Sequence, residues 1–169
     1  ITIDYSYEDE PLGTGGAIKK VEERLDEVFV AANGDVFADI SLTEQINTHF
    51  SCGAEVTISL TPVVNTEEFG TAEVDDENRI IKFVEKAKKG DEPSNLANAG
   101  VYIINKTAIS YIPDTGAFDF SKDLLPILMR EQKRIQGFML KGLWRDVGRP
   151  NDLLGANTDM ASKLYGYMD

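Results

Sequence analysis

Short apolar runs alternate with helically spaced apolar residues along nearly the whole chain, and this alternation constrains the fold more than any other feature. Apolar residues at every second position, or in β-branched runs, predict strands at 1–7, 28–32, 54–62, 70–74, 79–84, 99–104 and 134–138. Helical spacing predicts helices at 17–25, 43–50, 118–129 and 151–165, with Pro126 an obstacle inside the third. The pattern indicates an α/β domain with a mainly parallel sheet and an inserted β-hairpin, in which 28–32 is a strand buried on both faces.

Composition narrows the class of protein. The 169 residues suit one domain, 1–169, and the single His49 and Cys52 are too few for a zinc site or a disulfide framework. We expect both to be structural. A net charge of −12 argues against a nucleic-acid partner, and no apolar stretch reaches the ~18 residues of a membrane span. The chain begins without Met and without a signal peptide, as if within a strand, so we expect a fragment of a cytoplasmic protein.

Three glycines lie in the segment 11–16, Pro-Leu-Gly-Thr-Gly-Gly, between the first predicted strand and the first predicted helix. Glycine lets the backbone approach a ligand closely, and a helix N-terminus attracts anions. The spacing matches neither the dinucleotide-binding fingerprint nor the P-loop. A flexible strand-to-helix turn is therefore an equally good interpretation.

Two acidic residues stand in turns beside predicted strands. Asp35 follows Asn33-Gly34 at the end of the most apolar run, and Asp146 lies within Trp144-Arg145-Asp146-Val147-Gly148. Ligands of open α/β sheets bind beyond the carboxyl ends of the strands, where two carboxylates would together hold Mg²⁺. The alternatives are a turn-capping Asp35 and a surface charge at Asp146. Their separation in sequence does not decide between these readings.

Glu85 and Lys86 are neighbours at the end of the second hairpin strand. Neighbours in a strand point to opposite faces, so we expect them not to pair simply with each other. Glu85 would accept hydrogen bonds from hydroxyl groups, and Lys86 would reach a phosphate. The alternative is an exposed, charged strand end.

Seven segments carry a further signal: Glu10-Pro11-Leu12-Gly13-Thr14-Gly15-Gly16-Ala17, Asn33-Gly34-Asp35, Phe69-Gly70-Thr71-Ala72-Glu73-Val74, Phe83-Val84-Glu85-Lys86, Asn98-Ala99-Gly100-Val101-Tyr102, Phe118-Asp119-Phe120 and Trp144-Arg145-Asp146-Val147-Gly148-Arg149-Pro150. In this order they resemble the nucleotidyltransferases that make nucleotide sugars, the NDP-sugar pyrophosphorylases. Each segment is a weak signal by itself. Seven in register along nearly the whole chain are a strong one.

The resemblance implies a Rossmann-like, three-layer nucleotidyltransferase fold whose first strands are missing from this chain. It also implies a reaction in which a sugar 1-phosphate and a nucleoside triphosphate give an NDP-sugar and pyrophosphate. The sugar phosphate oxygen attacks the α-phosphorus in line, so catalysis consists mainly of positioning and charge neutralisation. The partners would be these two small substrates.

Carried over by position, the expected catalytic residues are Asp35, Lys86 and Asp146. The two aspartates would hold Mg²⁺ between the phosphates of the substrates, and Lys86 would contact the sugar phosphate. The expected nucleotide-binding residues are Pro11, Leu12, Gly13, Thr14, Gly15 and Gly34. The expected sugar-binding residues are Gly70, Glu85, Asn98 and Gly100.

The chain also departs from the family pattern. The family's opening glycine-rich loop, G-x-G-T-R-L with a lysine further on, clamps the triphosphate and is absent from this sequence. We therefore expect the chain to be inactive by itself, although its parent would be an enzyme. Ala87 stands where proline is common, and the β-helix domain of some relatives is absent. Missing strands would expose backbone edges, which a second copy in a homo-oligomer, rearranged strands or a lost N-terminal piece would cover.

The segments 12–16 and 144–150 look closest to guanylyltransferases that act on mannose 1-phosphate or heptose 1-phosphate. Thymidylyl- and uridylyltransferases for glucose 1-phosphate remain alternatives, because base choice rests on a few hydrogen bonds of ~1 kcal/mol each. A different class, a non-catalytic subunit that binds nucleotide sugars, is the other alternative. Two metal-binding aspartates and Lys86 together favour the enzyme.

Overall fold

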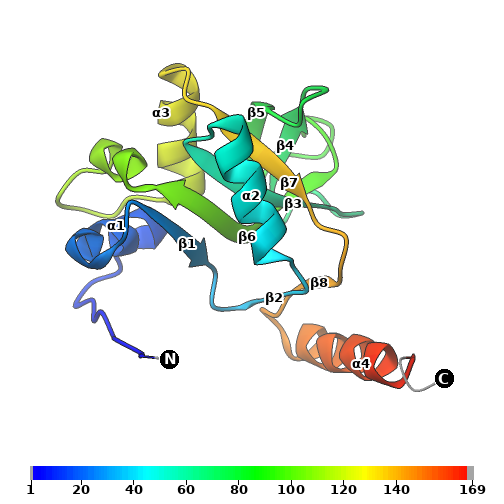
Figure 1. The fold of residues 1–169 in the computed structure, drawn as a ribbon. Coiled ribbons are helices and arrows are strands. Elements are labelled where there is room, and N and C mark those ends of the chain that lie inside the picture. The colour runs from blue at the N-terminus through cyan, green and yellow to red at the C-terminus, as the bar shows by residue number, and fades with distance from the viewer. Residues whose placement is uncertain (1, 167–169) are drawn as a thin grey trace.

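A computed structural model describes residues 2–166, with side chains to residue 163. Its centre is a six-stranded sheet in the order β5-β4-β6-β3-β7, with β1 also paired to β6 (Figure 1). The strands are β1 (Val28–Ala32), β3 (Val56–Pro62), β4 (Gly70–Val74), β5 (Ile80–Glu85), β6 (Leu96–Asn105) and β7 (Ile135–Met139). A separate two-stranded ribbon pairs β2 (Val36–Ala38) with β8 (Trp144–Asp146). Six of the seven predicted strands are thereby confirmed within a few residues.

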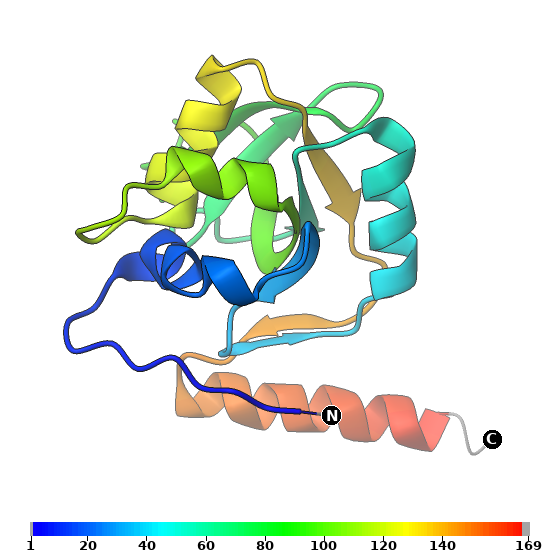
Figure 2. The same ribbon diagram turned by 60° about the vertical axis from the view of Figure 1, so that its left-hand side comes forward.

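Helices cover both faces of the sheet, as Figure 2 shows. Helix α2 packs against β3, β6 and β7, while α3 and the π-helical turn before it contact β5 from the other side. The helical elements are α1 (Gly13–Lys20), η1 (Glu22–Arg24), α2 (Leu42–Cys52), η2 (Lys106–Tyr111), η3 (Phe120–Leu124), α3 (Leu125–Arg130) and α4 (Pro150–Gly166). The three-layer α/β arrangement predicted from the sequence is confirmed.

The predicted direction of the strands is wrong. Among the strands that the structure describes, only β3 and β7 run parallel, whereas β6 is antiparallel to β1, β3 and β4, and β4 is antiparallel to β5. Likewise β1 is half-exposed, with Val30 43% accessible, instead of being buried on both faces. An apolar run indicates that a strand is buried, but it does not indicate whether the adjacent strands run parallel or antiparallel to it.

The two faces of the sheet differ in chemistry. On the α3 side, Ile58 and Leu60 of β3 join Leu124 and Leu128 in the fully buried apolar core. On the α2 side, β3 presents polar side chains that meet polar residues of α2. His49 is 1% exposed, and its Nδ1 lies 2.9 Å from Thr57 Oγ1. The structural role predicted for His49 fits this burial and this partner.

Local signals explain where the helices begin and end. Ser41 caps α2 by accepting a hydrogen bond from Glu44 N, and Gly53 ends it with φ 62°, a conformation that favours glycine. Pro126 does not break a helix but stands at the start of α3, where its missing N–H costs nothing. A π-helical turn, η3, precedes it. The single helix predicted at 118–129 is therefore two helical segments.

Helix α1 begins at Gly13, four residues before the predicted start at 17. The glycines predicted to form a loop are its first turn, and the N–H groups of Gly15 and Gly16 donate to Phe118 O at 2.9 and 3.0 Å. A Cβ on Gly13 would lie 2.7 Å from the same oxygen. Glycine is needed here because two backbones approach each other closely.

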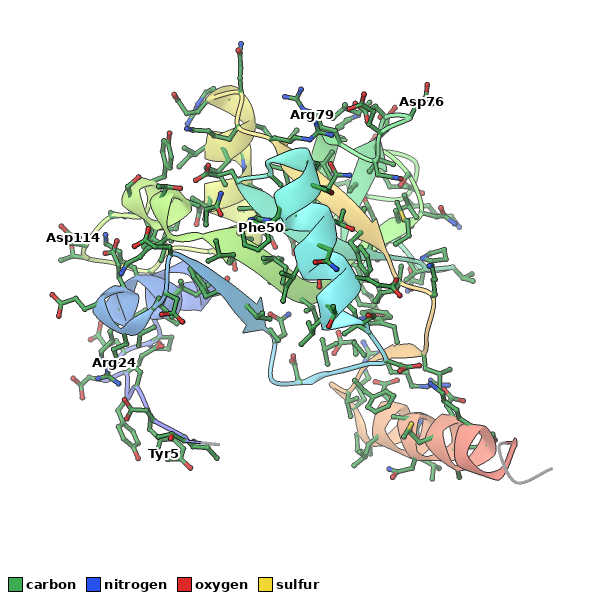
Figure 3. All side chains as sticks on the ribbon, viewed as in Figure 1. Tyr5, Arg24, Phe50, Asp76, Arg79 and Asp114 are labelled. Atoms are coloured by element: carbon green, nitrogen blue, oxygen red, sulfur yellow. The ribbon has the colours of Figure 1, made fainter. Side chains whose placement is uncertain are left out.

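The strand predicted at 1–7 is wrong for residues 2–7, which are exposed and pair with no strand of the sheet; Ile1 lies outside the described residues. Tyr5 stands clear of the body of the protein in Figure 3. An ion pair of 2.7 Å between Asp4 and Arg24 ties the segment to η1. Alternating apolar residues give a segment one apolar and one polar face, but the segment forms a β-strand only where a neighbouring strand pairs with it.

The closing helix predicted at 151–165 is α4, which lies apart from the sheet in both views and contacts β8 (Figures 1 and 2). The 2.6 Å ion pair of Arg145 with Asp159 joins it to the ribbon. Leu153 and Leu154 on this helix are 55% and 68% exposed. Across residues 2–166, no helix has both the length and the apolar character that crossing a membrane requires.

Candidate active site

One cavity of about 190 Å³ brings together residues from seven separate parts of the chain. It lies where β4, β5 and β6 meet the turn after β1 and the β2–β8 ribbon. Its lining includes every predicted catalytic and sugar-binding residue, and one predicted nucleotide-binding residue: Asp35, Lys86, Asp146, Gly70, Glu85, Asn98, Gly100 and Thr14. We call the part around Asp35 and Asp146 the carboxylate end, and the part around Gly70, Glu85, Asn98 and Tyr102 the hydroxyl end.

The ribbon positions the carboxylate end. Val36 pairs with Asp146 in the β2–β8 register, and Val147 N donates to Asp35 O at 2.8 Å. These backbone contacts hold two aspartates that are 111 positions apart in sequence at the same end of the ribbon. The two aspartates that the sequence alone could not place together therefore line one cavity.

Like charge gathers around Asp146. Desolvation raises the pKa of its carboxyl, and Asp35, Asp152 and Glu68 raise it further, while Arg149 acts in the opposite direction. A bound cation would relieve this repulsion. Within residues 2–166, no three His, Cys, Asp or Glu side chains form a ready-made metal cage. Two carboxylates still fit Mg²⁺, which is commonly held by one or two carboxylates together with substrate phosphates and water.

At the hydroxyl end, Gly70 on β4 pairs in register with Glu85 on β5. A Cβ on residue 70 would overlap the Glu85 carboxylate and lie 2.6 Å from the Phe83 ring, so only glycine leaves room for the acid. Glu85 is half-buried, and burial raises the pKa of its carboxyl, with a further contribution from Asp119. It is thus a partly desolvated acceptor at the wall of the cavity.

Glu85 and Lys86 do not point to opposite faces, as two neighbours within a strand are expected to do. Strand β5 ends at Glu85, and Lys86 has φ 48°, in the left-handed region. Its N–H donates to Phe69 O at 3.1 Å. This turn breaks the strand alternation, so both side chains line the same cavity, where Lys86 lowers the raised pKa of Glu85.

A bulge shapes the middle of β6. Between Asn98 and Tyr102 this strand advances four residues, while β3 advances two, from Leu60 to Ile58. Gly100 lies in the bulge with φ 74°, and a Cβ there would be 2.8 Å from Asn33 Nδ2. Asn33 N also donates to Gly100 O at 2.9 Å. Gly100 therefore lets the turn that carries Asp35 pack against β6.

The bulge also brings Asn98 and Tyr102 together. The Asn98 amide donates to Tyr102 Oη at 2.8 Å and to Ser121 Oγ at 3.2 Å, and its oxygen accepts from Gly100 N at 3.0 Å. Tyr102 packs on Phe120 with ring centroids 4.7 Å apart, and burial raises the pKa of its hydroxyl. Both Asn98 N–H bonds are used, whereas its oxygen can accept one more hydrogen bond besides that from Gly100 N, so the oxygen is the atom left to meet a ligand.

Sequence reasoning gave no role to Tyr102, Ser121, Asp119 or Trp144, all of which line the cavity. Trp144 Nε1 donates to Ala99 O at 3.0 Å, and its ring meets Phe69 edge-on with centroids 5.3 Å apart. Tyr102, Asp119 and Trp144 stand inside segments already singled out, so those segments were the available signal. For Ser121 the sequence offers none.

The predicted nucleotide-binding residues are not all gathered at one place. Thr14 and Gly34 line a neighbouring pocket of about 590 Å³ between α1 and β1. Gly13 and Gly15 pack on Phe118, and Pro11 is exposed.

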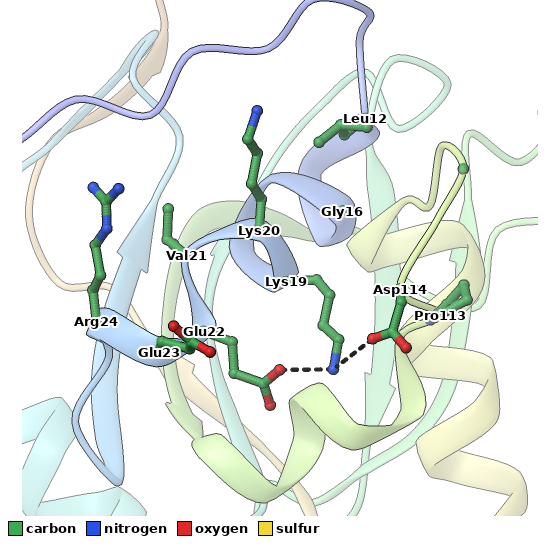
Figure 4. A pocket seen from close by; sticks show the side chains of 11 residues that line it. Leu12, Gly16, Lys19, Lys20, Val21, Glu22, Glu23, Arg24, Pro113 and Asp114 are labelled. Atoms are coloured by element: carbon green, nitrogen blue, oxygen red, sulfur yellow. Dashed lines mark hydrogen bonds and ion pairs between the residues drawn. The ribbon is translucent and has the colours of Figure 1, made fainter.

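Leu12 lines a different pocket, of about 540 Å³, which Figure 4 shows between α1, η1 and the 113–116 segment. Lys19 Nζ lies there 2.7 Å from Glu22 and 3.5 Å from Asp114. The hydrogen bond with Glu22 raises the pKa of Lys19. Because the ammonium group of Lys19 already pairs with two carboxylates, we do not expect Lys19 to bind an anionic ligand in this pocket.

Comparison with known proteins identifies the family of this chain. Residues 1–163 match the family described as nucleotidyl transferase, and the chain belongs to that family. It is 32% identical to a mannose-1-phosphate guanylyltransferase of Mycobacterium tuberculosis, over 95% of this chain and 45% of that protein. It is 35% identical to a D-glycero-alpha-D-manno-heptose 1-phosphate guanylyltransferase of Aneurinibacillus thermoaerophilus, over 95% of this chain and 68% of that protein.

A third relative is the bifunctional protein GlmU of Methanococcus maripaludis, 32% identical over 96% of this chain and 39% of that protein. The chain thus spans less than half the length of two of these three curated relatives. Among solved structures, HddC of Yersinia pseudotuberculosis is 28% identical with a TM-score of 0.74, covering 90% of this chain and 64% of that one. A Bacillus anthracis protein, 22% identical with a TM-score of 0.80 over 92% of this chain and 63% of that one, shares the fold. The Rossmann-like nucleotidyltransferase fold implied by the sequence is confirmed.

Proposed function

We propose that the protein of which this chain forms part transfers a nucleotidyl group from a nucleoside triphosphate to a sugar 1-phosphate. An oxygen of the sugar phosphate forms a bond to the α-phosphorus, the bond from the α-phosphorus to the bridging oxygen breaks, and pyrophosphate leaves. The observation that carries the proposal is the convergence of Asp35, Asp146, Lys86 and Glu85 in one cavity. Membership of the nucleotidyl transferase family supports it.

Each group has a role that its chemistry allows. Asp35 and Asp146 would hold Mg²⁺, which supplies charge neutralisation at the phosphates when bound. Lys86 places an ammonium group beside the sugar phosphate, while Glu85 and the oxygen of Asn98 accept hydrogen bonds from sugar hydroxyls. The phosphate nucleophile is already an anion, so the residues need to position it and do not need to deprotonate it.

We propose GTP as the nucleotide and mannose 1-phosphate, or a related manno-configured sugar, as the acceptor. Two of the relatives named above are guanylyltransferases for mannose 1-phosphate and manno-heptose 1-phosphate. HddC, a structural relative at 28% identity, has also been solved with GMP-PN. Because the GlmU relative is not named as a guanylyltransferase, the test below also includes other nucleotide sugars.

Ligand-dependent thermal melting tests the proposal on the chain itself, with Mg²⁺ and GDP-mannose, UDP-glucose, dTDP-glucose or ADP-glucose. At ~100 times the dissociation constant, ligand adds ~2.7 kcal/mol of stability, which is roughly 5–10 °C for a domain of this size. We expect the largest shift with GDP-mannose.

Asp35→Asn should reduce that shift. Asp76→Asn removes the same charge at the exposed loop between β4 and β5 (Figure 3), at the opposite end of this hairpin from Gly70 and Glu85, and should leave the shift unchanged. If none of the nucleotide sugars shifts the melting temperature, or if both variants weaken the shift equally, the proposed role of this cavity is wrong.

A further inference from the structure

A continuous run of hydrogen bonds joins α1 to the hydroxyl end of the cavity. It starts at Thr14, whose hydroxyl accepts from Phe120 N at 2.8 Å and donates to Asp119 Oδ2 at 3.3 Å. The other oxygen of Asp119 accepts from Ser121 N at 2.9 Å and Lys122 N at 2.8 Å. Thr14 and Asp119 together fix the first turn of η3.

The same turn reaches β6 on its other side. Ser121 Oγ accepts from the Asn98 amide at 3.2 Å, and the Asn98 oxygen in turn accepts from Gly100 N at 3.0 Å. The orientation of the Asn98 amide therefore depends on where η3 begins. The start of η3 at Phe120 in turn depends on Thr14, 106 positions earlier in the sequence.

Backbone packing makes this connection stiff. Gly15 N and Gly16 N both donate to Phe118 O, so two hydrogen bonds tie the first turn of α1 to the residues before η3. A Cβ on Gly15 would lie 3.0 Å from that oxygen, so the two segments are in direct contact. At the far end, Gly100 packs against Asn33, which begins the turn that carries Asp35.

From these contacts, and resting on the proposed function, we infer that Thr14, Asp119 and Ser121 are positioning residues that couple the first turn of α1 to sugar recognition by Asn98. The family resemblance implies that Thr14 binds the nucleotide. The geometry instead gives its hydroxyl two protein partners and makes it act on the sugar through η3. A ligand that engages the first turn of α1 thereby tunes the affinity for the sugar.

Hydrogen exchange in the ligand-free chain tests the connection itself. Thr14→Val keeps the β-branched shape but removes the hydroxyl, while Thr14→Ser keeps the hydroxyl and is the matched control. In the valine variant, the amides of Phe120 and of Gly100 should both exchange faster, by about fivefold for the loss of one hydrogen bond. Faster exchange at Phe120 alone would show a merely local role and would overturn the inference.

Binding measurements test the consequence. The ratio of the dissociation constants of GDP and GDP-mannose, each with Mg²⁺, isolates the contribution of the sugar. Thr14→Val and Ser121→Ala should each lower this ratio by about fivefold with little change for GDP, and Thr14→Ser should leave it at the value of the unmodified chain. An equal loss for GDP and GDP-mannose would make Thr14 a plain nucleotide contact and overturn the inference.

The two tests also separate this inference from the proposed function. If the unmodified chain binds neither GDP nor GDP-mannose, the proposed function fails at this cavity. The exchange of Gly100 still decides whether Thr14 and Asn98 are connected.

Discussion

The two ends of the cavity are built in different ways. The hydroxyl end stands on long strands of the central sheet, and its Asn98 amide has three protein partners. The carboxylate end stands on a ribbon of two three-residue strands, and its aspartates are exposed. A site that discriminates among sugar hydroxyl groups needs hydrogen-bond acceptors in fixed positions. A cation site instead holds carboxylates that repel each other, and a bound cation relieves this repulsion.

Gly100 joins the two ends, so its replacement should have the largest effect. Gly100→Ala combines a left-handed backbone, costing ~1–2 kcal/mol, with overpacking against Asn33, costing ~1–3 kcal/mol. We expect urea unfolding to show a loss of about 2–4 kcal/mol in the free energy of unfolding.

The control for that experiment is Gly90→Ala. Gly90 also has a positive φ, 95°, but a Cβ there would meet nothing within 4 Å. It should lose only the backbone contribution. Equal losses in the two variants would show that the contact between Gly100 and Asn33 does not hold the two ends together.

A smaller loss should follow at the hydroxyl end alone. Tyr102→Phe removes the hydroxyl that accepts from Asn98 while keeping the ring that packs on Phe120. One buried hydrogen bond contributes ~1 kcal/mol, so the melting temperature should fall by roughly 2–4 °C. An unchanged melting temperature together with unchanged affinity for the sugar would mean that this end is less fixed than its geometry indicates.

Glu85→Gln separates stability from recognition at the same end. Because the pKa of Glu85 is raised in the folded state, the folded protein binds the proton more tightly than the unfolded one. The contribution of Glu85 to stability therefore falls as pH rises from its ordinary pKa through the raised value, and the glutamine variant loses this dependence. We expect a small gain in melting temperature at neutral pH, a difference that shrinks toward acidic pH, and weaker binding of the sugar.

The smallest effect should come from the carboxylate end. The pKa of Asp146 is raised as well, so at neutral pH its charge slightly opposes folding. Asp146→Asn should raise the melting temperature by about 1–2 °C, and less in high salt, because surface charge effects stay within ~0.5 kcal/mol. A clear loss of stability, comparable with that of Tyr102→Phe, would remove the contrast between the two ends.

Much of the site was recognisable from local sequence. Asp35, Glu85, Lys86, Asn98 and Asp146 all line the cavity. Local residue types suggested four of them, each beside a plainer alternative, whereas Asn98 was expected only from the family resemblance. Ser121 was not recognisable, because a single serine in a helical segment carries no such signal. It belongs to the site only because η3 lies beside β6.

The sequence by itself determined most of the strands and helices, since periodicity and capping residues act over a few positions, but it did not reveal the short strands β2 and β8 or the absence of a strand at 2–7. It did not determine that β6 runs antiparallel to its neighbours, that α1 begins at Gly13, or that Glu85 and Lys86 share a cavity. Those features depend on contacts between residues far apart in the chain. Strand direction, close backbone approach and a left-handed turn are set by the segment packed alongside, so only the tertiary structure decided them.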